Sequence, residues 1–415
     1  MTPEAVRARL EALREAGARL RARSPHEVLA LLARALDVWS DPASAWRREL
    51  EAKLPAATGF APETVRRGLA RALADWNGEA RRRLVARALG DASDVTRAGF
   101  ETCAVVLAGS IPMPTLKALV APLALGTPVL AKPASRDSVS VELVARSLAE
   151  IDAGLGACVS LAPLSRVDAA ALDALLAAEC VVVYGDDATV ATLSGRSRAR
   201  RFVAHGHRLS LAVLGPGAHS GTALREAAAG LAEDIALWDQ LGCLSPIALY
   251  AVGADAAAAD RIADALAAAL ADAAHRWPRG AVEPAAAALF AGERAEAELR
   301  AAAGRGAAVH ADPAGAWCVV READVRLRPA PLHRFVRVHP VEDLHALGTA
   351  LAPLRRHLAG VALAGFGAGQ SALARDLVTD GASLVCAPGS LQAPPLDWES
   401  EGRGVLTSLA RSAAG

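Results

Sequence analysis

The sequence is poor in lysine, in aromatic residues and in net charge. Lysine occurs only at positions 53, 117 and 132 among 45 basic residues, and 45 acidic residues leave a net charge of +0. A chain without a net positive field gives no support to the binding of nucleic acid or of an anionic membrane. The six cysteines are scattered, with no Cys-x-x-Cys pair and no His/Cys cluster at zinc spacing. We therefore expect reduced thiols and no metal site.

Long apolar runs are also missing. Prolines and a glycine interrupt residues 118–131, and aspartates interrupt residues 254–275, so neither stretch predicts a membrane span. Residues 1–24 alternate charged residues with Val6, Leu10 and Leu13, which predicts an amphipathic helix and lacks the apolar core of a signal peptide. Together these absences predict a cytoplasmic protein. A length of 415 residues with 53% hydrophobic content predicts a globular chain of two to three domains.

The remaining pattern predicts an α/β protein with a helical N-terminal region. Residues 1–95 are helical in pattern, and from Cys103 short apolar strands alternate with helices. The predicted strands are 104–107, 128–131, 157–161, 180–184, 209–214, 247–252, 361–364 and 383–386, with helices at 114–125, 138–151, 168–177, 187–193, 222–238 and 370–380. Such alternation predicts βαβ units and parallel sheets covered on both faces.

Cys243 lies in the most informative stretch, residues 239–246 (DQLGCLSP). The helix predicted at 222–238 precedes it, Pro246 prevents a further helical turn, and a strand follows. A thiol in a tight turn between a helix and a strand is where a nucleophilic cysteine would be presented. The alternative is a small buried core residue, since free cysteine is among the most buried residue types. Whatever lowers the pKa of such a thiol is not visible in the sequence, although a helix end or His207 would do so.

Three further positions follow predicted strands. Lys132 stands at the carboxyl end of an apolar strand, where α/β folds bind ligands. Ser110 ends the first strand, and is either a helix cap or a functional hydroxyl. Gly185 follows strand 180–184 and would allow close approach of a cofactor, whereas capping by the adjacent aspartates is the simpler interpretation.

Two other motifs favour simpler interpretations. Residues 365–369 (GFGAG) lie between a strand and a helix but do not form G-x-G-x-x-G, so we interpret them as a tight turn rather than a phosphate-binding loop. His205 and His207 are spaced to share one strand face, but neither Cys nor acidic partners accompany them, so they do not indicate a metal site.

Six blocks in order resemble the bacterial fatty acyl-CoA reductases of the luciferase system, the LuxC-like branch of the aldehyde dehydrogenase superfamily. The resemblance covers about residues 60–400, and its blocks are 108–112 (AGSIP), 132–136 (KPASR), 184–186 (YGD), 205–210 (HGHRLS), 239–246 (DQLGCLSP) and 388–398 (PGSLQAPPLDW). It implies an aldehyde dehydrogenase-like fold. The expected domains are an N-terminal helical region (1–95), a cofactor-binding domain (96–215, completed by 375–415) and a catalytic domain (216–374).

The resemblance also assigns roles. Cys243 is implied as the nucleophile that accepts the acyl group, Lys132 as the residue that reaches the adenine ribose of the cofactor, and Gly185 as the small residue beside the cofactor phosphates. Ser135 and Arg136 would meet a 2′-phosphate, which favours NADPH, with NADH as the alternative.

Three departures from the wider family bear on the reaction. Ser110 stands where the family usually has an Asn that donates to the oxyanion, and loss of such a donor costs about a hundredfold or more in rate. Ala204 aligns with the Glu that activates water in hydrolytic relatives, as expected for an enzyme that reduces its acyl intermediate. Residues 398–402 (WESEG) replace the usual Trp-His-His-Asp-Gly, which leaves that tail without an assigned role.

The implied reaction is reduction of a fatty acyl thioester, delivered by CoA or a carrier protein, to an aldehyde. A homo-oligomer, and a partner enzyme that supplies acyl groups, are also expected. Other functions stay open on the residues alone: a cofactor-independent cysteine acyltransferase or thioesterase, a weakly active acyl-binding subunit, and a reductase of a phosphorylated acid.

Overall fold

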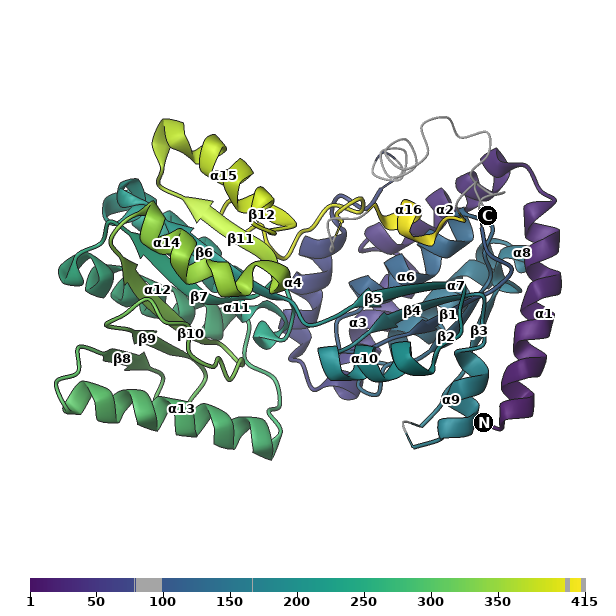
Figure 1. Ribbon diagram of the computed structural model, residues 1–415, viewed down its shortest axis with the longest axis horizontal. Helices are drawn as coiled ribbons and strands as arrows, with labels where there is room; N and C mark the ends of the chain where they lie inside the picture. Colours follow the sequence, from purple (N-terminus) through teal and green to yellow (C-terminus); the bar gives the residue numbers. More distant parts are fainter. Residues whose placement is uncertain (78, 80–98, 166, 400–403, 412–415) are drawn as a thin grey trace. The chain divides into compact units, whose positions relative to one another are not determined.

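The computed structural model describes residues 1–77, 79, 99–165, 167–399 and 404–411. The chain forms two compact units, each built around its own sheet (Figure 1). The first unit comprises Met1–Thr58, Ala72–His207 and Pro395–Gly415, and the second comprises Gly59–Arg71 and Arg208–Pro394. No helix among the described residues is long and apolar enough to cross a membrane.

The first unit contains a five-stranded parallel sheet in the order β3-β2-β1-β4-β5. Its strands are β1 (Cys103–Val106), β2 (Val129–Lys132), β3 (Val159–Leu161), β4 (Cys180–Tyr184) and β5 (Arg201–His205). Cys103 pairs with Val129 on one side and with Cys180 on the other. Because β1, β2 and β4 are parallel neighbours, their carboxyl ends, followed by the predicted site residues, meet at one edge.

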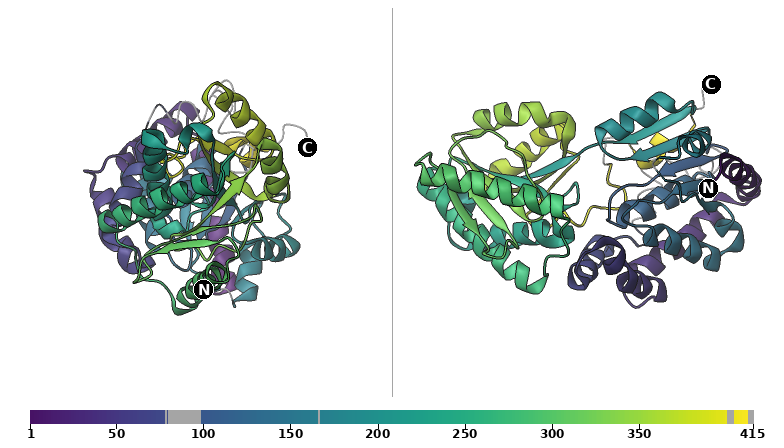
Figure 2. Two further views of the ribbon diagram at one scale, coloured as in Figure 1. Left: turned by 90° about the vertical axis from the view of Figure 1, so that its left-hand side faces the viewer. Right: turned by 90° about the horizontal axis from the view of Figure 1, so that it is seen from below.

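Helices of the first unit cover both faces of this sheet (Figure 2). They are α1 (Pro3–Arg21), α2 (Pro25–Ser40), α3 (Ala45–Thr58), α6 (Met113–Ala124), α7 (Val139–Ile151), α8 (Ala153–Gly156), α9 (Ala169–Leu175), α10 (Asp187–Arg196) and α16 (Val405–Leu409). Val6, Leu10 and Leu13 of α1 pack in one cluster with Leu130 of β2 and Leu175 of α9. The stripe noted in the sequence is thus the face that α1 buries.

The observed units differ from the expected domain ranges. Helices α1 to α3 pack within the first unit instead of forming a separate region, because their apolar stripes are buried there. Residues 59–71, which include most of α4 (Pro62–Leu73), belong to the second unit. The boundary between the units falls at His207, and Pro395 returns the chain to the first. Of the expected helical region 1–95, residues 78 and 80–95 lie outside the described residues.

The second unit is built on a seven-stranded sheet in the order β12-β11-β6-β7-β10-β9-β8, in which only β8 and β9 pair antiparallel. Its strands are β6 (Leu209–Leu214), β7 (Pro246–Val252), β8 (Ala308–Ala311), β9 (Cys318–Arg321), β10 (Phe335–Val341), β11 (Leu358–Ala364) and β12 (Leu384–Cys386). Its helices are α11 (Gly221–Ala236), α12 (Ala256–Arg276), α13 (Pro284–Ala302), α14 (Leu344–Leu351) and α15 (Gln370–Thr379), with 3-10 turns at Pro216–Ala218, Leu237–Gln240, Ala352–His357 and Gly367–Gly369.

The α/β architecture with largely parallel sheets confirms the predicted fold class, and each predicted strand from 104–107 to 383–386 has an observed counterpart. Strands β8, β9 and β10 have no individually predicted counterpart, and neither has β5. Strand β5 lies at the edge of its sheet and is half-buried along its whole length, so it lacks the continuous apolar run that marks the central strands.

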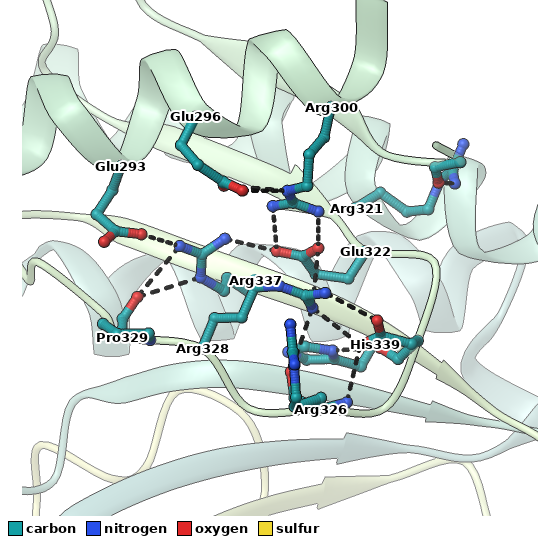
Figure 3. A network of polar contacts seen from close by, with 12 residues as sticks. Glu293, Glu296, Arg300, Arg321, Glu322, Arg326, Arg328, Pro329, Arg337 and His339 are labelled. Atoms are coloured by element: carbon teal, nitrogen blue, oxygen red, sulfur yellow. Dashed lines mark hydrogen bonds and ion pairs between the residues drawn. The ribbon is translucent and has the colours of Figure 1, made fainter. Parts of the chain in front are cut away.

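A buried cluster of charges fixes β10 against β9 and α13 (Figure 3). Glu322 accepts hydrogen bonds from Arg300 at 2.6 Å and from Arg337 at 2.5 Å, and Arg337 also donates to Glu293 at 2.6 Å. Burial raises the pKa of Glu322, but the hydrogen bonds and charges of Arg300 and Arg337 outweigh it, so the net pKa lies below its usual value. Glu322 therefore stays ionised at neutral pH, and its bonds hold the strand that begins at Phe335.

Candidate functional site

Cys243 is presented to solvent at the junction that the sequence predicts. Helix α11 ends at Ala236, the 3-10 turn Leu237–Gln240 follows, and β7 begins at Pro246. Residues 241–245 form the connecting loop, called here the cysteine loop. Among the six cysteines, which all lie in described parts of the chain, only Cys243 is exposed; Cys386 is half-buried and the other four are buried. The accessible thiol is thus the one in the turn.

The environment of the Cys243 sulfur acts on its pKa in both directions. Surrounding protein reduces its hydration and raises the pKa of the thiol, although the side chain remains reachable by solvent. The backbone N–H group of Cys243, the charge of Arg208 and the backbone N–H group of Leu244 oppose this shift without cancelling it, so the net pKa of the thiol stays above its usual value. Arg208 is held at the start of β6 by donation to the carbonyl oxygen of Arg356 at 3.1 Å. The sequence pointed to a helix end or His207 for this task, and Arg208 was missed because only the sheet brings it near residue 243.

Two side chains fasten the cysteine loop from neighbouring elements. The buried hydroxyl of Ser210 in β6 donates to the carbonyl oxygen of Cys243 at 2.7 Å and accepts from the N–H of Gly360 in β11 at 2.9 Å. The side-chain amide of Gln392 donates to the hydroxyl of Ser245 at 3.2 Å. The loop is therefore tied to β6 beneath it and to the segment after β12.

Asp234 in turn holds the segment that carries Gln392. Its carboxylate accepts from the backbone N–H groups of Gly389 at 2.7 Å, Leu391 at 3.1 Å and Gln392 at 3.3 Å. The side chain is fully buried, and this burial raises its pKa to about 7 although the three N–H donors oppose the change. Part of block 388–398 thus fastens the cysteine loop, a role that the sequence did not reveal.

The backbone before Cys243 is in an unusual conformation. Trp238, Asp239 and Gln240 have φ values of 56°, 49° and 63°, in the left-handed region that L-residues rarely adopt. A second left-handed segment, residues 332–334, precedes β10 with φ values from 57° to 71°. Each such residue costs roughly 1–3 kcal/mol and persists only where the surroundings enforce it. Strain of this kind concentrates at functional sites, here within five residues of Cys243.

The residues predicted to bind a cofactor lie in the first unit, at the carboxyl edge of its sheet. Lys132 is the last residue of β2 and is only 7% exposed, with its ammonium group donating to the carbonyl oxygen of Pro133 at 3.4 Å. Ser135 and Arg136 follow in an exposed turn. Gly185 directly follows β4, two strands away from β2. The sheet thus places these four residues at the carboxyl ends of the two strands that flank β1.

Local geometry limits what Gly185 and Ser110 can do. A Cβ atom at residue 185 would lie 3.2 Å from the Thr189 side chain, so a larger residue would crowd the first turn of α10. Asp186 caps α10 by accepting from the N–H of Thr189 at 2.6 Å. The helix cap expected from the aspartates is therefore present next to Gly185. Ser110, buried after β1, does not cap α6, whose N-cap residue is Pro112.

The remaining motifs have structural explanations. Gly365 has φ +87°, and a Cβ atom there would lie 2.6 Å from the carbonyl oxygen of Gly215, so residues 365–369 form the tight turn that the sequence predicts. His205 ends β5 and stacks on Tyr184 with ring centroids 4.4 Å apart. Within the described ranges, no group of three or more His, Cys, Asp or Glu side chains is arranged to hold a metal ion.

Solved structures of similar shape are aldehyde dehydrogenases. An NAD-dependent benzaldehyde dehydrogenase from Corynebacterium glutamicum matches with a TM-score of 0.72 and 16% identity, over 99% of this chain and 89% of its own. Aldehyde dehydrogenase 21 from Physcomitrella patens and methylmalonate-semialdehyde dehydrogenase from Oceanimonas doudoroffii each match with a TM-score of 0.73 and 14% identity, over 99% of this chain and 90% of theirs. The protein therefore has the aldehyde dehydrogenase fold.

The sequence narrows this class to one family. The acyl-CoA reductase (LuxC) family model matches residues 20–412, so the chain belongs to that family. No curated protein matches the chain. The resemblance found in the sequence is confirmed, and the protein is an oxidoreductase that acts on acyl and aldehyde groups.

Proposed function

We propose that the protein reduces a fatty acyl thioester to an aldehyde through a covalent acyl group on Cys243, with NADPH as the reductant. The observation that carries the proposal is the exposed thiol of Cys243, held in an anchored loop that directly follows the left-handed residues 238–240, in a member of the acyl-CoA reductase family. The other five cysteines are buried or, in the case of Cys386, half-buried, so none is as accessible as Cys243.

The first chemical step is acyl transfer. The thiolate of Cys243 attacks the carbonyl carbon of the substrate, a new sulfur–carbon bond forms, and the CoA or carrier thiol leaves with a proton. Burial keeps the net pKa of the Cys243 thiol above its usual value, and the N–H groups of Cys243 and Leu244 together with Arg208 limit that rise. Ser110, at the position of the family's oxyanion donor, is the residue proposed to hydrogen-bond the developing oxyanion.

The residues at the edge of the first sheet fit a nicotinamide cofactor. Lys132 offers a buried cation, and Gly185 leaves the backbone after β4 without a side chain, at a place where a Cβ atom would crowd Thr189. The hydroxyl of Ser135 and the guanidinium of Arg136 suit a 2′-phosphate, which favours NADPH over NADH. Similarity to an NAD-dependent dehydrogenase supports this cofactor class. When bound, NADPH would supply the hydride that converts the acyl group to an aldehyde.

The absence of an acid–base group at residue 204 supports reduction over hydrolysis. Ala204 lies in β5 and aligns with the water-activating Glu of hydrolytic relatives. A methyl side chain takes no proton from water, so an acyl group on Cys243 would persist until it is reduced. The leaving aldehyde then regenerates the free thiol.

The proposal is tested with the full chain and its Cys243→Ala variant, each given a series of acyl-CoA substrates with NADPH or NADH. We expect cysteine-dependent loss of reduced nicotinamide with one aldehyde formed per cofactor oxidised. Free acid without cofactor oxidation would instead identify a thioesterase. No turnover with any acyl donor would identify a weakly active acyl-binding subunit, the outcome suggested by Ser110 in place of Asn.

A further inference from the structure

A single side chain spans the cysteine loop. Gln240 is completely buried, and its amide nitrogen donates to the carbonyl oxygen of Pro246 at 2.8 Å and to that of Phe335 at 2.9 Å. Its amide oxygen accepts from the N–H of Phe335 at 2.8 Å. Gln240 and Pro246 are the two residues that bracket loop 241–245, so the first of these bonds closes the loop around Cys243. The other two join it to the first residue of β10.

Asp239 makes a second connection between the same two segments. One carboxylate oxygen accepts from the guanidinium of Arg334 at 2.6 and 3.1 Å, and the other accepts from the N–H of Gly280 at 3.0 Å. Arg334 also donates to the carbonyl oxygen of Trp277 at 2.7 Å. Asp239 is 3% exposed and Arg334 is 0% exposed, so the pair forms in the interior.

These bonds coincide with the unusual backbone. Throughout the described residues, positive φ at non-glycine positions occurs only in the two segments 238–240 and 332–334. The Asp239–Arg334 pair links the two segments directly, and Gln240 links the first to Phe335, which follows the second. Relaxation of residues 238–240 toward the right-handed region would rotate the chain that follows and displace residue 243. The side-chain bonds therefore maintain the conformation that places the thiol.

We propose that Gln240, supported by the Asp239–Arg334 pair, is a positioning residue that holds the Cys243 thiol in its reactive place. The proposal rests on Cys243 being the acyl acceptor. Gln240 does not touch the substrate in this role. It acts by closing the cysteine loop, so its loss slows acylation of Cys243 in protein that is still folded.

The decisive variant is Gln240→Glu, which keeps the size and one acceptor oxygen of the side chain. At about pH 8 its second oxygen is charged and faces the carbonyl oxygens of Pro246 and Phe335, where the amide had donated. Burial and the two facing carbonyl oxygens raise the pKa of the introduced carboxyl, so its protonated fraction grows as the pH falls toward 6, and the protonated form restores one donated bond. The matched control is Gln370→Glu, which makes the same change at a glutamine whose amide oxygen accepts from Phe366 at the 365–369 turn.

The measurement is the rate of acyl addition to Cys243, followed by intact mass after mixing with acyl-CoA in the absence of NADPH, with circular dichroism to confirm folding. At pH 8 we expect acylation of Gln240→Glu to be about tenfold slower or more, since small displacements of reacting groups have effects of this size. The half-saturating acyl-CoA concentration should stay within about twofold of wild type, because substrate contacts are unchanged.

The pH series separates positioning from general stability. Relative to wild type at each pH, the rate for Gln240→Glu should recover several-fold between pH 8 and pH 6. The charged or titratable groups on the joined segments are Asp239, Cys243, His333 and Arg334. Both proteins share them, so the rate is compared with that of wild type at each pH. If the variant does not fold at pH 8, its acylation rate is measured at pH 6. This rate should still be several-fold below that of wild type, because only one of the two donated bonds is restored there.

Outcomes for the two proposals are distinct. Wild type that gains no acyl group on Cys243, or a Cys243→Ala variant that retains activity, would refute the proposed function; alkylation of the thiol by iodoacetamide would then still report its placement. Wild-type acylation together with an equal rate in folded Gln240→Glu at pH 8 would overturn the positioning role alone. Gln370→Glu should match wild type throughout.

Discussion

Replacing Asp234 with Asn should make protein stability less dependent on pH. Burial raises the pKa of this carboxyl from 3.8 to about 7. The hydrogen bonds that it accepts from three backbone N–H groups act in the opposite direction but are outweighed. The folded protein therefore holds the proton up to about pH 7, whereas the unfolded chain releases it near pH 3.8. It follows that the free energy of unfolding falls as pH rises through this window, because the folded state binds more protons than the unfolded state.

The size of the effect follows from the two pKa values. A rise from 3.8 to about 7 corresponds to roughly 4 kcal/mol in full, of which about 3 kcal/mol develops between about pH 5 and pH 8.5. Asn is neutral throughout, and its single oxygen cannot serve all three N–H groups; a buried donor left unpaired costs about 1–3 kcal/mol at every pH. The informative quantity is thus the difference in free energy of unfolding between variant and wild type, and how this difference changes with pH.

The assay is urea unfolding of both proteins near pH 5 and pH 8.5, followed by circular dichroism. On going to the higher pH, the variant should gain about 3 kcal/mol relative to wild type. Asp376→Asn, which changes an exposed carboxyl on α15 of the same unit, is the matched control and should show no comparable gain. A difference between Asp234→Asn and wild type that stays constant with pH would refute the reasoning.

Three further predictions concern other parts of the two units. Ser210→Ala removes the donor to the carbonyl oxygen of Cys243 and the acceptor of a buried N–H. The free energy of unfolding, measured by thermal denaturation, should fall by about 1–3 kcal/mol, and alkylation of the Cys243 thiol should become slower. An unchanged alkylation rate would contradict the anchoring role. Glu322→Gln removes the negative charge that pairs with Arg337 and its neighbours in the interior. The free energy of unfolding in urea should fall by about 3–5 kcal/mol, and an unchanged midpoint would show that the charge cluster is dispensable. Burial lowers the pKa of Lys117 to about 8, so its ¹³C-methyl resonance after reductive methylation should titrate near pH 8, and a midpoint near 10.5 would refute the buried setting.

The anchors of the cysteine loop show why the site was only partly visible in the sequence. The thiol itself was predictable, because a helix pattern, a glycine next to the cysteine, a proline and an apolar strand all occur within about thirty residues. Its fastenings come from afar: Arg334 lies 95 positions from Asp239, and Gly389 lies 155 positions from Asp234. No local pattern announces such pairs, since either partner alone resembles an ordinary polar residue.

The sequence alone determined the alternation of strands and helices, the family and the exposed turn at Cys243, because hydrophobic periodicity and turn residues act through neighbours along the chain. Only the tertiary structure decided which cation opposes the rise in the thiol pKa, where the half-buried edge strand β5 pairs, and how the N-terminal helices join the first sheet. It also decided that Gln240 closes the cysteine loop. These features depend on burial and on contacts between distant segments, and both come into existence only when the chain has folded.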